Sequence, residues 1–224
     1  MDRLSCRGEL FEPGETPFQI CSADLDQYIQ SGRCSIHNRP LTSEDENRFS
    51  TLICWHVIEH IEDDLEFAKM LHGATADNGY LYIAVPARDD YWGIEDETTG
   101  HFRRYTRATL TDLLHQCGYE VPEVISSNVP TSNLLLGLSN AVIRNQESNK
   151  LSMNKEHQTV TSGVREIRWK TVYPSIFHLI LNRFTLWPLH LLQKLFFDSD
   201  YGTMVIAVAK RSKHEANANN ISEF

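Results

Sequence analysis

Three polar side chains that could move protons or bind a metal ion follow an apolar run in the middle of the chain. Residues 49–61 read FSTLICWHVIEHI, and the polar members are His56, Glu59 and His60. Imidazole and carboxylate groups act as acids, bases and metal ligands. This cluster is therefore the first place to look for a site.

A buried strand and a helix are the elements that would position this cluster. Leu52 and Ile53 belong to an apolar run with β-branched content, which predicts a strand. Glu62, Asp63 and Asp64 come next, and acidic side chains stabilise the positive first turn of a helix. Ligands of open α/β sheets bind outside the carboxyl ends of the strands. We therefore expect a strand, a polar tip that faces a ligand, and a helix.

Two other interpretations of the cluster need to be weighed. The segment from His56 to His60 fits the H-x-x-E-H pattern of a class of zinc metallopeptidases, in which two histidines share one helix face. Here the pattern follows a strand-like run, and no third ligand can be identified. The structural interpretation is that His56 and His60 cap the strand and pack beneath the next helix.

Together with two later segments, this run resembles the fourth-strand motif of class I S-adenosylmethionine-dependent methyltransferases, in the small-molecule group related to the ubiquinone-biosynthesis enzymes. The later segments are DNGYLYIAVP at 77–86 and GHFRRYTRATLTDLLHQCGYEV at 100–121. The resemblance covers residues 9–125 and is weaker in the last strand. It implies an α/β fold with a Rossmann-like methyltransferase sheet, mostly parallel, whose last strand is antiparallel.

The resemblance implies S-adenosylmethionine as the cofactor and suggests which residues bind it. Glu12 would lie at the tip of the second strand and accept hydrogen bonds from both ribose hydroxyls, because a carboxylate has two acceptor oxygens. Asn38 would follow the third strand and contact the adenine. The tip of the fourth strand adds Cys54, Trp55 and His56. The alternative for Glu12 is a surface carboxylate before a turn.

The acceptor side of such a site would come from the loop at 87–105, since functional residues collect in loops after strand ends. Methyl transfer depends mainly on aligning the acceptor with the methyl group. His101 is the candidate base for a hydroxyl acceptor. Arg103 and Arg104 are candidates for binding an anionic group on the acceptor, and Trp92 is a candidate for a further contact with the acceptor. The arginines could instead pair with acidic residues of the same loop.

No metal is expected, because the acids at 95–97 form no clear ligand pattern.

The glycine-rich loop that opens this fold is missing from the sequence. Its glycines let the backbone approach the cofactor at a helix N-terminus, but Gly8, Gly14 and Gly32 are isolated and no G-x-G occurs. The residues before Glu12 are too few for a strand, a loop and a helix. We therefore expect a sheet without its first strand and helix, with unpaired edges and open apolar faces. The alternative function is a degenerate, cofactor-free relative that binds a partner.

Composition limits the remaining classes. A chain of 224 residues can form one ample core. Its net charge of −9 argues against a general nucleic-acid binder. Five cysteines without a C-x-x-C pair predict free thiols in a reducing compartment, and we expect a cytoplasmic protein. No uncharged apolar run reaches the roughly 18 residues that a spanning helix needs.

The segment pattern predicts a single domain over 1–211 and a disordered tail over 212–224. Helices are expected at 16–31, after residue 62 and from Thr106, with strands at 34–37, 80–85, 119–126 and 203–209. Residues 128–197 form an insertion or lid. Its apolar part, 173–197, either covers the substrate cavity or lies on a membrane surface with its basic side chains at the headgroups. The acceptor is a small or lipid-like molecule that the sequence does not identify.

Overall fold

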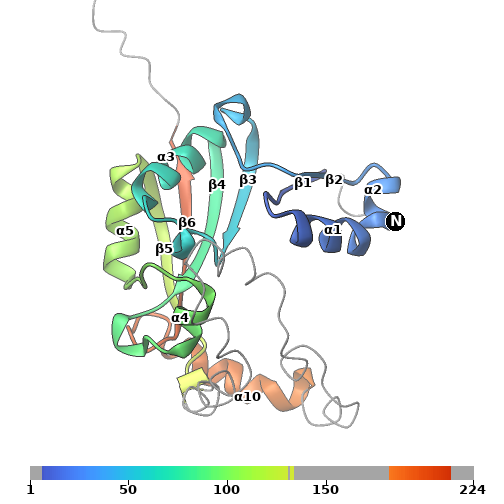
Figure 1. The fold of residues 1–224 in the computed structure, drawn as a ribbon. Coiled ribbons are helices and arrows are strands. Elements are labelled where there is room, and N and C mark those ends of the chain that lie inside the picture. The colour runs from blue at the N-terminus through green and yellow to red at the C-terminus, as the bar shows by residue number, and fades with distance from the viewer. Residues whose placement is uncertain (1–6, 131, 134–181, 213–224) are drawn as a thin grey trace, which may run out of the picture.

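Two sheets organise the computed structural model, which describes residues 7–130, 132–133 and 182–212 (Figure 1). One sheet has two parallel strands, and the other has four strands in the order β3-β4-β6-β5. The strands are β1 (Gly8–Phe11), β2 (Cys34–His37), β3 (Phe49–Trp55), β4 (Thr75–Pro86), β5 (Tyr119–Ser127) and β6 (Met204–Arg211). β3 and β4 are parallel, while β6 is antiparallel to both its neighbours. The predicted α/β sheet with an antiparallel last strand is confirmed.

Helices connect the strands. They are α1 (Glu15–Asp24), α2 (Asp26–Gln30), α3 (Asp64–Ala74), α4 (Ile94–Thr99), α5 (Arg107–Gln116) and α10 (Arg183–Lys194), with 3-10 turns η1 (Ser43–Asp45), η2 (Ile58–His60) and η3 (Asp89–Tyr91). The expected starts of two helices are confirmed. Asp63 caps α3 through a hydrogen bond from the Glu66 N–H, and Thr106 caps α5 in the same way.

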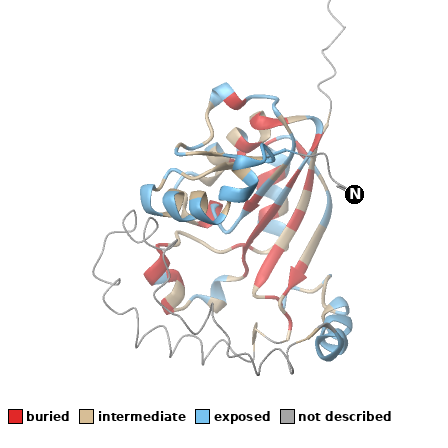
Figure 2. Cartoon of the chain, turned by 90° about the vertical axis from the view of Figure 1, so that its right-hand side faces the viewer, coloured by how far each residue is buried: buried red, intermediate tan, exposed pale blue. Residues whose placement is uncertain are grey.

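One face of the four-stranded sheet forms the core. Leu81 and Ile83 of β4 are fully buried and belong to one apolar cluster with residues of α3 and α5. Because side chains alternate along a strand, Tyr80 and Tyr82 point to the other face, where they are 38% and 40% exposed. Ile53 of β3 is 72% exposed on that face. These three side chains are therefore accessible on that face, and Figure 2 shows buried residues along the strands of the sheet.

No hydrogen-bonded strand lies between β1 and β3 in the described part of the chain, so the two sheets stay separate. Figure 1 shows the small sheet and its two helices beyond the β3 edge of the large one. The rings of Phe11 and Phe49 meet edge to face with centroids 5.7 Å apart. Side chains rather than a backbone ladder therefore join the two sheets.

Several predicted boundaries differ from the structure for local reasons. The helix expected at 16–31 is split at Leu25 into α1 and α2, neither of which has a buried residue, so packing does not hold one continuous helix. The Asn78-Gly79 pair predicts a turn, but Asn78 has φ of 59° inside the longer β4. Pro122 predicts an edge strand, and β5 is one, with a register shift between Glu120 and Glu123. Most of the predicted lid, at 131 and 134–181, and the tail from 213 lie outside the described residues.

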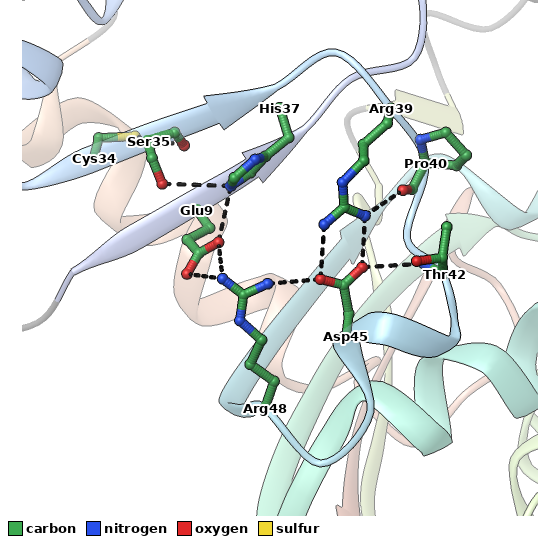
Figure 3. Close-up of polar contacts among 9 residues, drawn as sticks. All are labelled: Glu9, Cys34, Ser35, His37, Arg39, Pro40, Thr42, Asp45 and Arg48. Carbon is green, nitrogen blue, oxygen red and sulfur yellow. Dashed lines mark hydrogen bonds and ion pairs between the residues drawn. The ribbon is translucent and has the colours of Figure 1, made fainter.

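A charged network links the small sheet to the segment before β3 (Figure 3). Asp45 accepts two hydrogen bonds from Arg39, at 2.7 and 3.0 Å, and one from Arg48 at 2.6 Å. Arg48 also bonds to the carboxylate of Glu9 on β1, which lies 2.9 Å from His37 on β2. The charged run at 42–48 predicts a surface turn. That prediction is wrong for Asp45, since its side chain is fully buried. Hydrogen bonding to Arg39 holds the pKa of Asp45 well below its usual range.

Replacing Asp45 with asparagine should lower the free energy of unfolding at pH 7 by about 1–3 kcal/mol, since hydrogen bonds to charged groups are lost. The folded pKa lies below the unfolded value, so the contribution of Asp45 is present above about pH 5 and is lost as the pH falls further. Urea unfolding of both proteins at pH 7 and pH 3 measures this. If the two proteins differed in free energy of unfolding by the same amount at both pH values, the ionised Asp45 carboxylate would not be the source of the stability.

Candidate functional site

The candidate site begins at the carboxyl end of β3, where the chain turns sharply. His56 has φ of 54°, in the left-handed region that residues other than glycine seldom adopt. Its backbone N–H donates to the carbonyl of Ala84 on β4, at 2.9 Å. The turn fixes His56 at the strand tip and leads into η2.

Glu59, in η2, places a carboxylate inside the protein. Its side chain is fully buried, and Oε1 lies 3.0 Å from Nδ1 of His56. The other oxygen, Oε2, has no hydrogen-bond partner in the described part of the chain. The backbone carbonyl of Glu59 accepts from the N–H of Phe102 at 2.8 Å. This bond brings the segment before α5 alongside the strand tip.

His60 and His101 meet at this point from distant parts of the chain. Their ring centroids are 4.6 Å apart, and the planes are nearly perpendicular at 76°. Nδ1 of His60 is buried, and no described residue forms a hydrogen bond with it. Burial, together with the nearby His101, lowers the pKa of His60 to about 4, so its imidazole is neutral at pH 7. One potential ligand atom from each of Glu59, His60 and His101 lies within 4.8 Å of the others.

Asp96, in α4, orients the His101 ring. Its Oδ1 lies 2.8 Å from Nδ1 of His101, and both carboxylate oxygens accept hydrogen bonds from Arg104 at 2.8 Å. Oδ2 also accepts from the backbone N–H of Gly93 at 2.7 Å. Burial opposes ionisation of Asp96, but the hydrogen bonds from His101 and Arg104 outweigh burial and lower its pKa to about 2. Asp96 is thus a buried, ionised carboxylate.

Both predicted acceptor arginines are engaged within the chain. Arg104 pairs with Asp96, which is fully buried and not a surface acid. Arg103 donates to the carbonyl of Ile61 at 3.0 Å and pairs with Asp64 at 3.0 Å. The two arginines tie the segment before α5 to its surroundings. Their contact with an anionic acceptor remains a prediction.

The predicted cofactor residues lie at three strand ends. Glu12 follows β1 directly, and its Oε1 accepts from the N–H of Gly14 at 3.0 Å. Asn38 follows β2 and donates through Nδ2 to Glu15 at 2.7 Å. The third end is that of β3, which continues into His56. Glu12 and Asn38 thus lie together on the small sheet, and the other candidates on the large one.

The side chains at the end of β3 differ in accessibility. Cys54 is buried in the core, so only its backbone could contact a ligand. Burial also raises the pKa of its thiol to about 12. Trp55 points to the open face and is 49% exposed. Trp92, just after η3, is 38% exposed, which leaves its ring accessible for the acceptor contact predicted for it.

The helical H-x-x-E-H arrangement does not form. His56 lies before η2 with a left-handed φ, and η2 is a 3-10 turn of three residues. His56 and His60 therefore do not share one α-helical face, which the zinc peptidase interpretation requires. That interpretation is wrong for this strand tip.

The sequence indicates two residues of the site only in part or not at all. It offers Asp96 as one of several surface acids that could pair with the arginines, whereas Asp96 is buried and holds both His101 and Arg104. It gives no sign that the backbone of Thr99 interacts with His60. The signal available for Asp96 was its place three residues after Gly93, because a side chain at that position can accept from the N–H that begins the helix.

Comparison with known proteins places this arrangement in a family. The model of the methyltransferase domain family matches residues 9–124. The structure of the [4+2]-cyclase SpnF has 11% identity and a TM-score of 0.55, with 94% of this chain and 69% of that chain covered. A protein described as a methyltransferase from Bacillus halodurans C-125 has 11% identity and a TM-score of 0.51, with 92% and 84% covered. No curated protein matches the chain.

The two kinds of match carry different weight. At 11% identity the solved structures establish a shared Rossmann-like methyltransferase fold and no shared chemistry. The matched residues 9–124 make up more than half of the chain and include the ends of β1, β2, β3 and β4. On that ground, the chain belongs to the methyltransferase domain family.

Proposed function

We propose that this chain transfers a methyl group from S-adenosylmethionine to a small-molecule or lipid-like acceptor. The observation that carries the proposal is the family match over residues 9–124, which spans the strand ends where ligands of such sheets bind. The structure of another protein with this fold is that of a [4+2]-cyclase, so the fold by itself does not determine the reaction.

The residues at the ends of β1 and β2 fit the ribose and adenine parts of the cofactor. Glu12 is a half-buried carboxylate at a strand tip, already oriented by the Gly14 N–H. A carboxylate can accept from two vicinal hydroxyls. Asn38 has an exposed amide, whose donors and acceptor suit the polar edge of a base. When bound, S-adenosylmethionine supplies an electrophilic methyl group.

His101 fits the role of general base for a hydroxyl acceptor. Its Nδ1 faces the ionised Asp96, so Nε2 is the nitrogen that would take the acceptor's proton. The carboxylate would stabilise the resulting imidazolium, as an acidic residue does beside a catalytic histidine. Arg103 and Arg104 hold this segment in place, which supports alignment of the acceptor.

Calorimetric titration with S-adenosylmethionine tests the proposal. We expect saturable binding with one site per chain. A titration without heat of binding, repeated at a second temperature to exclude an accidental zero enthalpy, would instead favour the second candidate. That candidate is a cofactor-free relative that binds a partner, and the open face with Ile53, Tyr80 and Tyr82 favours it.

We also propose that α10 makes peripheral contact with a membrane surface. Phe184, Trp187 and Leu195 are 82%, 60% and 79% exposed, the sequence of α10 contains no acidic residue, and Figure 2 shows much of the helix exposed. Such a helix can place apolar side chains at the headgroup boundary. No helix in the described ranges has the length and hydropathy needed to cross a bilayer.

Co-flotation with vesicles containing anionic lipid tests this contact. Trp187→Ser should reduce the bound fraction severalfold, while Trp92→Ser, which removes an equally large ring elsewhere, should not. Equal flotation of all three proteins would contradict the contact. We further propose a cytoplasmic location, in line with five cysteines that form no C-x-x-C pair. We propose no nucleic-acid partner, in line with the net charge of −9.

A further inference from the structure

We propose that Glu59, His60 and His101 form a binding site for a divalent transition metal ion at the tip of β3. One ligand atom from each of the three side chains lies within 4.8 Å of the other two. Two of these residues are in η2, and the third comes from the segment before α5. Backbone pairing of Phe102 with Glu59 holds the two segments together.

Two buried atoms in this cluster lack the partner that burial demands. Glu59 Oε2 and His60 Nδ1 have no hydrogen-bond partner among the residues that the structure describes, and Glu59 is fully buried. A buried carboxylate oxygen left unpaired is costly, so groups of this kind call for a specific explanation. Since both atoms can donate an electron pair, one cation between them would satisfy both.

The outer contacts of the three side chains are those that metal ligands usually have. The outer oxygen of Glu59 faces Nδ1 of His56 at 3.0 Å, and Nδ1 of His101 faces the carboxylate of Asp96 at 2.8 Å. The backbone of Thr99 also interacts with His60. Carboxylates and carbonyls in this outer position orient a ligating histidine and fix its tautomer.

The ligand set selects the type of metal. Two imidazoles and one carboxylate suit Zn²⁺ and related transition metals, whereas Mg²⁺ and Ca²⁺ prefer oxygen ligands. Metal bonds of about 2.0–2.2 Å place tetrahedral ligand atoms roughly 3.3 Å apart. Ligand atoms within 4.8 Å of one another would therefore close on the ion with side-chain shifts of about 1 Å.

The site differs from the metallopeptidase pattern, and it bears on the proposed reaction. His56 would support Glu59 rather than bind the metal. A metal bound to Nε2 of His101 would occupy the nitrogen assigned above to the base, so the two roles are alternatives. Metal binding and S-adenosylmethionine binding are measured separately, and either can fail without the other.

Metal content of tag-free protein tests the site. Protein stripped with a chelator is dialysed against micromolar Zn²⁺, and the bound metal is determined by atomic emission. We expect one Zn²⁺ per chain in the wild type. Glu59→Gln, His60→Gln and His101→Gln should each weaken binding by at least about tenfold. His115→Gln, which removes an exposed histidine of α5, is the matched control and should bind like the wild type.

Titration with Co²⁺ covers the case in which a ligand variant fails to fold. Visible absorption typical of four- or five-coordinate Co²⁺, lost when Zn²⁺ displaces the Co²⁺, would support the site. This measurement needs only the wild-type protein. The proposal is overturned by a stripped wild type that takes up no stoichiometric metal. It is equally overturned by folded ligand variants that bind as well as His115→Gln, or by loss of metal in His56→Gln but not in His101→Gln.

Discussion

Replacing Asp96 with asparagine is expected to lower the free energy of unfolding by about 3–5 kcal/mol, the usual loss when one partner of a buried ion pair is removed. Asp96 is fully buried and accepts from Arg104, His101 and the Gly93 N–H. The asparagine amide would direct N–H groups at donors and leave the Arg104 charge uncompensated in a site that is itself largely buried. No other carboxylate is hydrogen-bonded to Arg104 in the described contacts.

Urea unfolding at pH 7, followed by circular dichroism, measures this loss. Asp112→Asn, on the exposed side of α5, removes the same charge without such contacts and should change stability little. Arg104→Lys is a second comparison, because lysine cannot make the paired hydrogen bonds and should be destabilising too. If Asp96→Asn and Asp112→Asn have the same free energy of unfolding, then the Asp96 carboxylate does not organise the site.

The position of the site at the end of β3 could be predicted from sequence because it depends on local order. An apolar strand, a polar tip and an acidic helix start are contiguous, and each has its own physical signal. The structure confirms the strand and the Asp63 cap of α3. The small sheet was predictable for the same reason, since β1 ends just before Glu12 and β2 spans 34–37.

Burial of charged residues could not be predicted from the same local signals. Asp45 and Asp96 lie in acidic runs typical of exposed turns, yet both are fully buried. Both carboxylates are paired with arginines three to eight residues away in the sequence, Asp45 with Arg39 and Arg48, and Asp96 with Arg104. Only the tertiary path of the chain brings such partners together, and a charge run by itself carries no sign of it.

The cluster of Glu59, His60 and His101 shows the same limit in a different way. The sequence offers His56, Glu59 and His60 as a contiguous pattern, which suggests a helical metal motif. The left-handed backbone at His56 turns its ring to the outer oxygen of Glu59 instead. The place of the third side chain is taken by His101, some forty residues on, which the pattern could not identify.

Replacing Glu12 with alanine is expected to weaken S-adenosylmethionine binding by about ten- to a hundredfold. Charge-assisted hydrogen bonds to the ribose are each worth roughly 1.5–3 kcal/mol, and about 1.4 kcal/mol corresponds to a factor of ten. Glu12→Gln should recover part of the loss, because its carbonyl still accepts but carries no charge. The fold should change little, since the Glu12 side chain accepts one hydrogen bond in the described part of the chain, from the Gly14 N–H. The measurement is the titration proposed for the wild type.

Glu66→Ala is the matched control, because it removes the same charge from an exposed position on α3. It separates a specific contact with the ribose from an effect of net charge, because a change in net charge would alter the S-adenosylmethionine affinity of both variants by the same amount. An affinity in Glu12→Ala equal to that of the wild type would mean that Glu12 serves only the turn after β1. The assignment of β1 as the strand that carries the ribose site, and with it the expectation that a preceding strand and helix are missing, would then have to be abandoned.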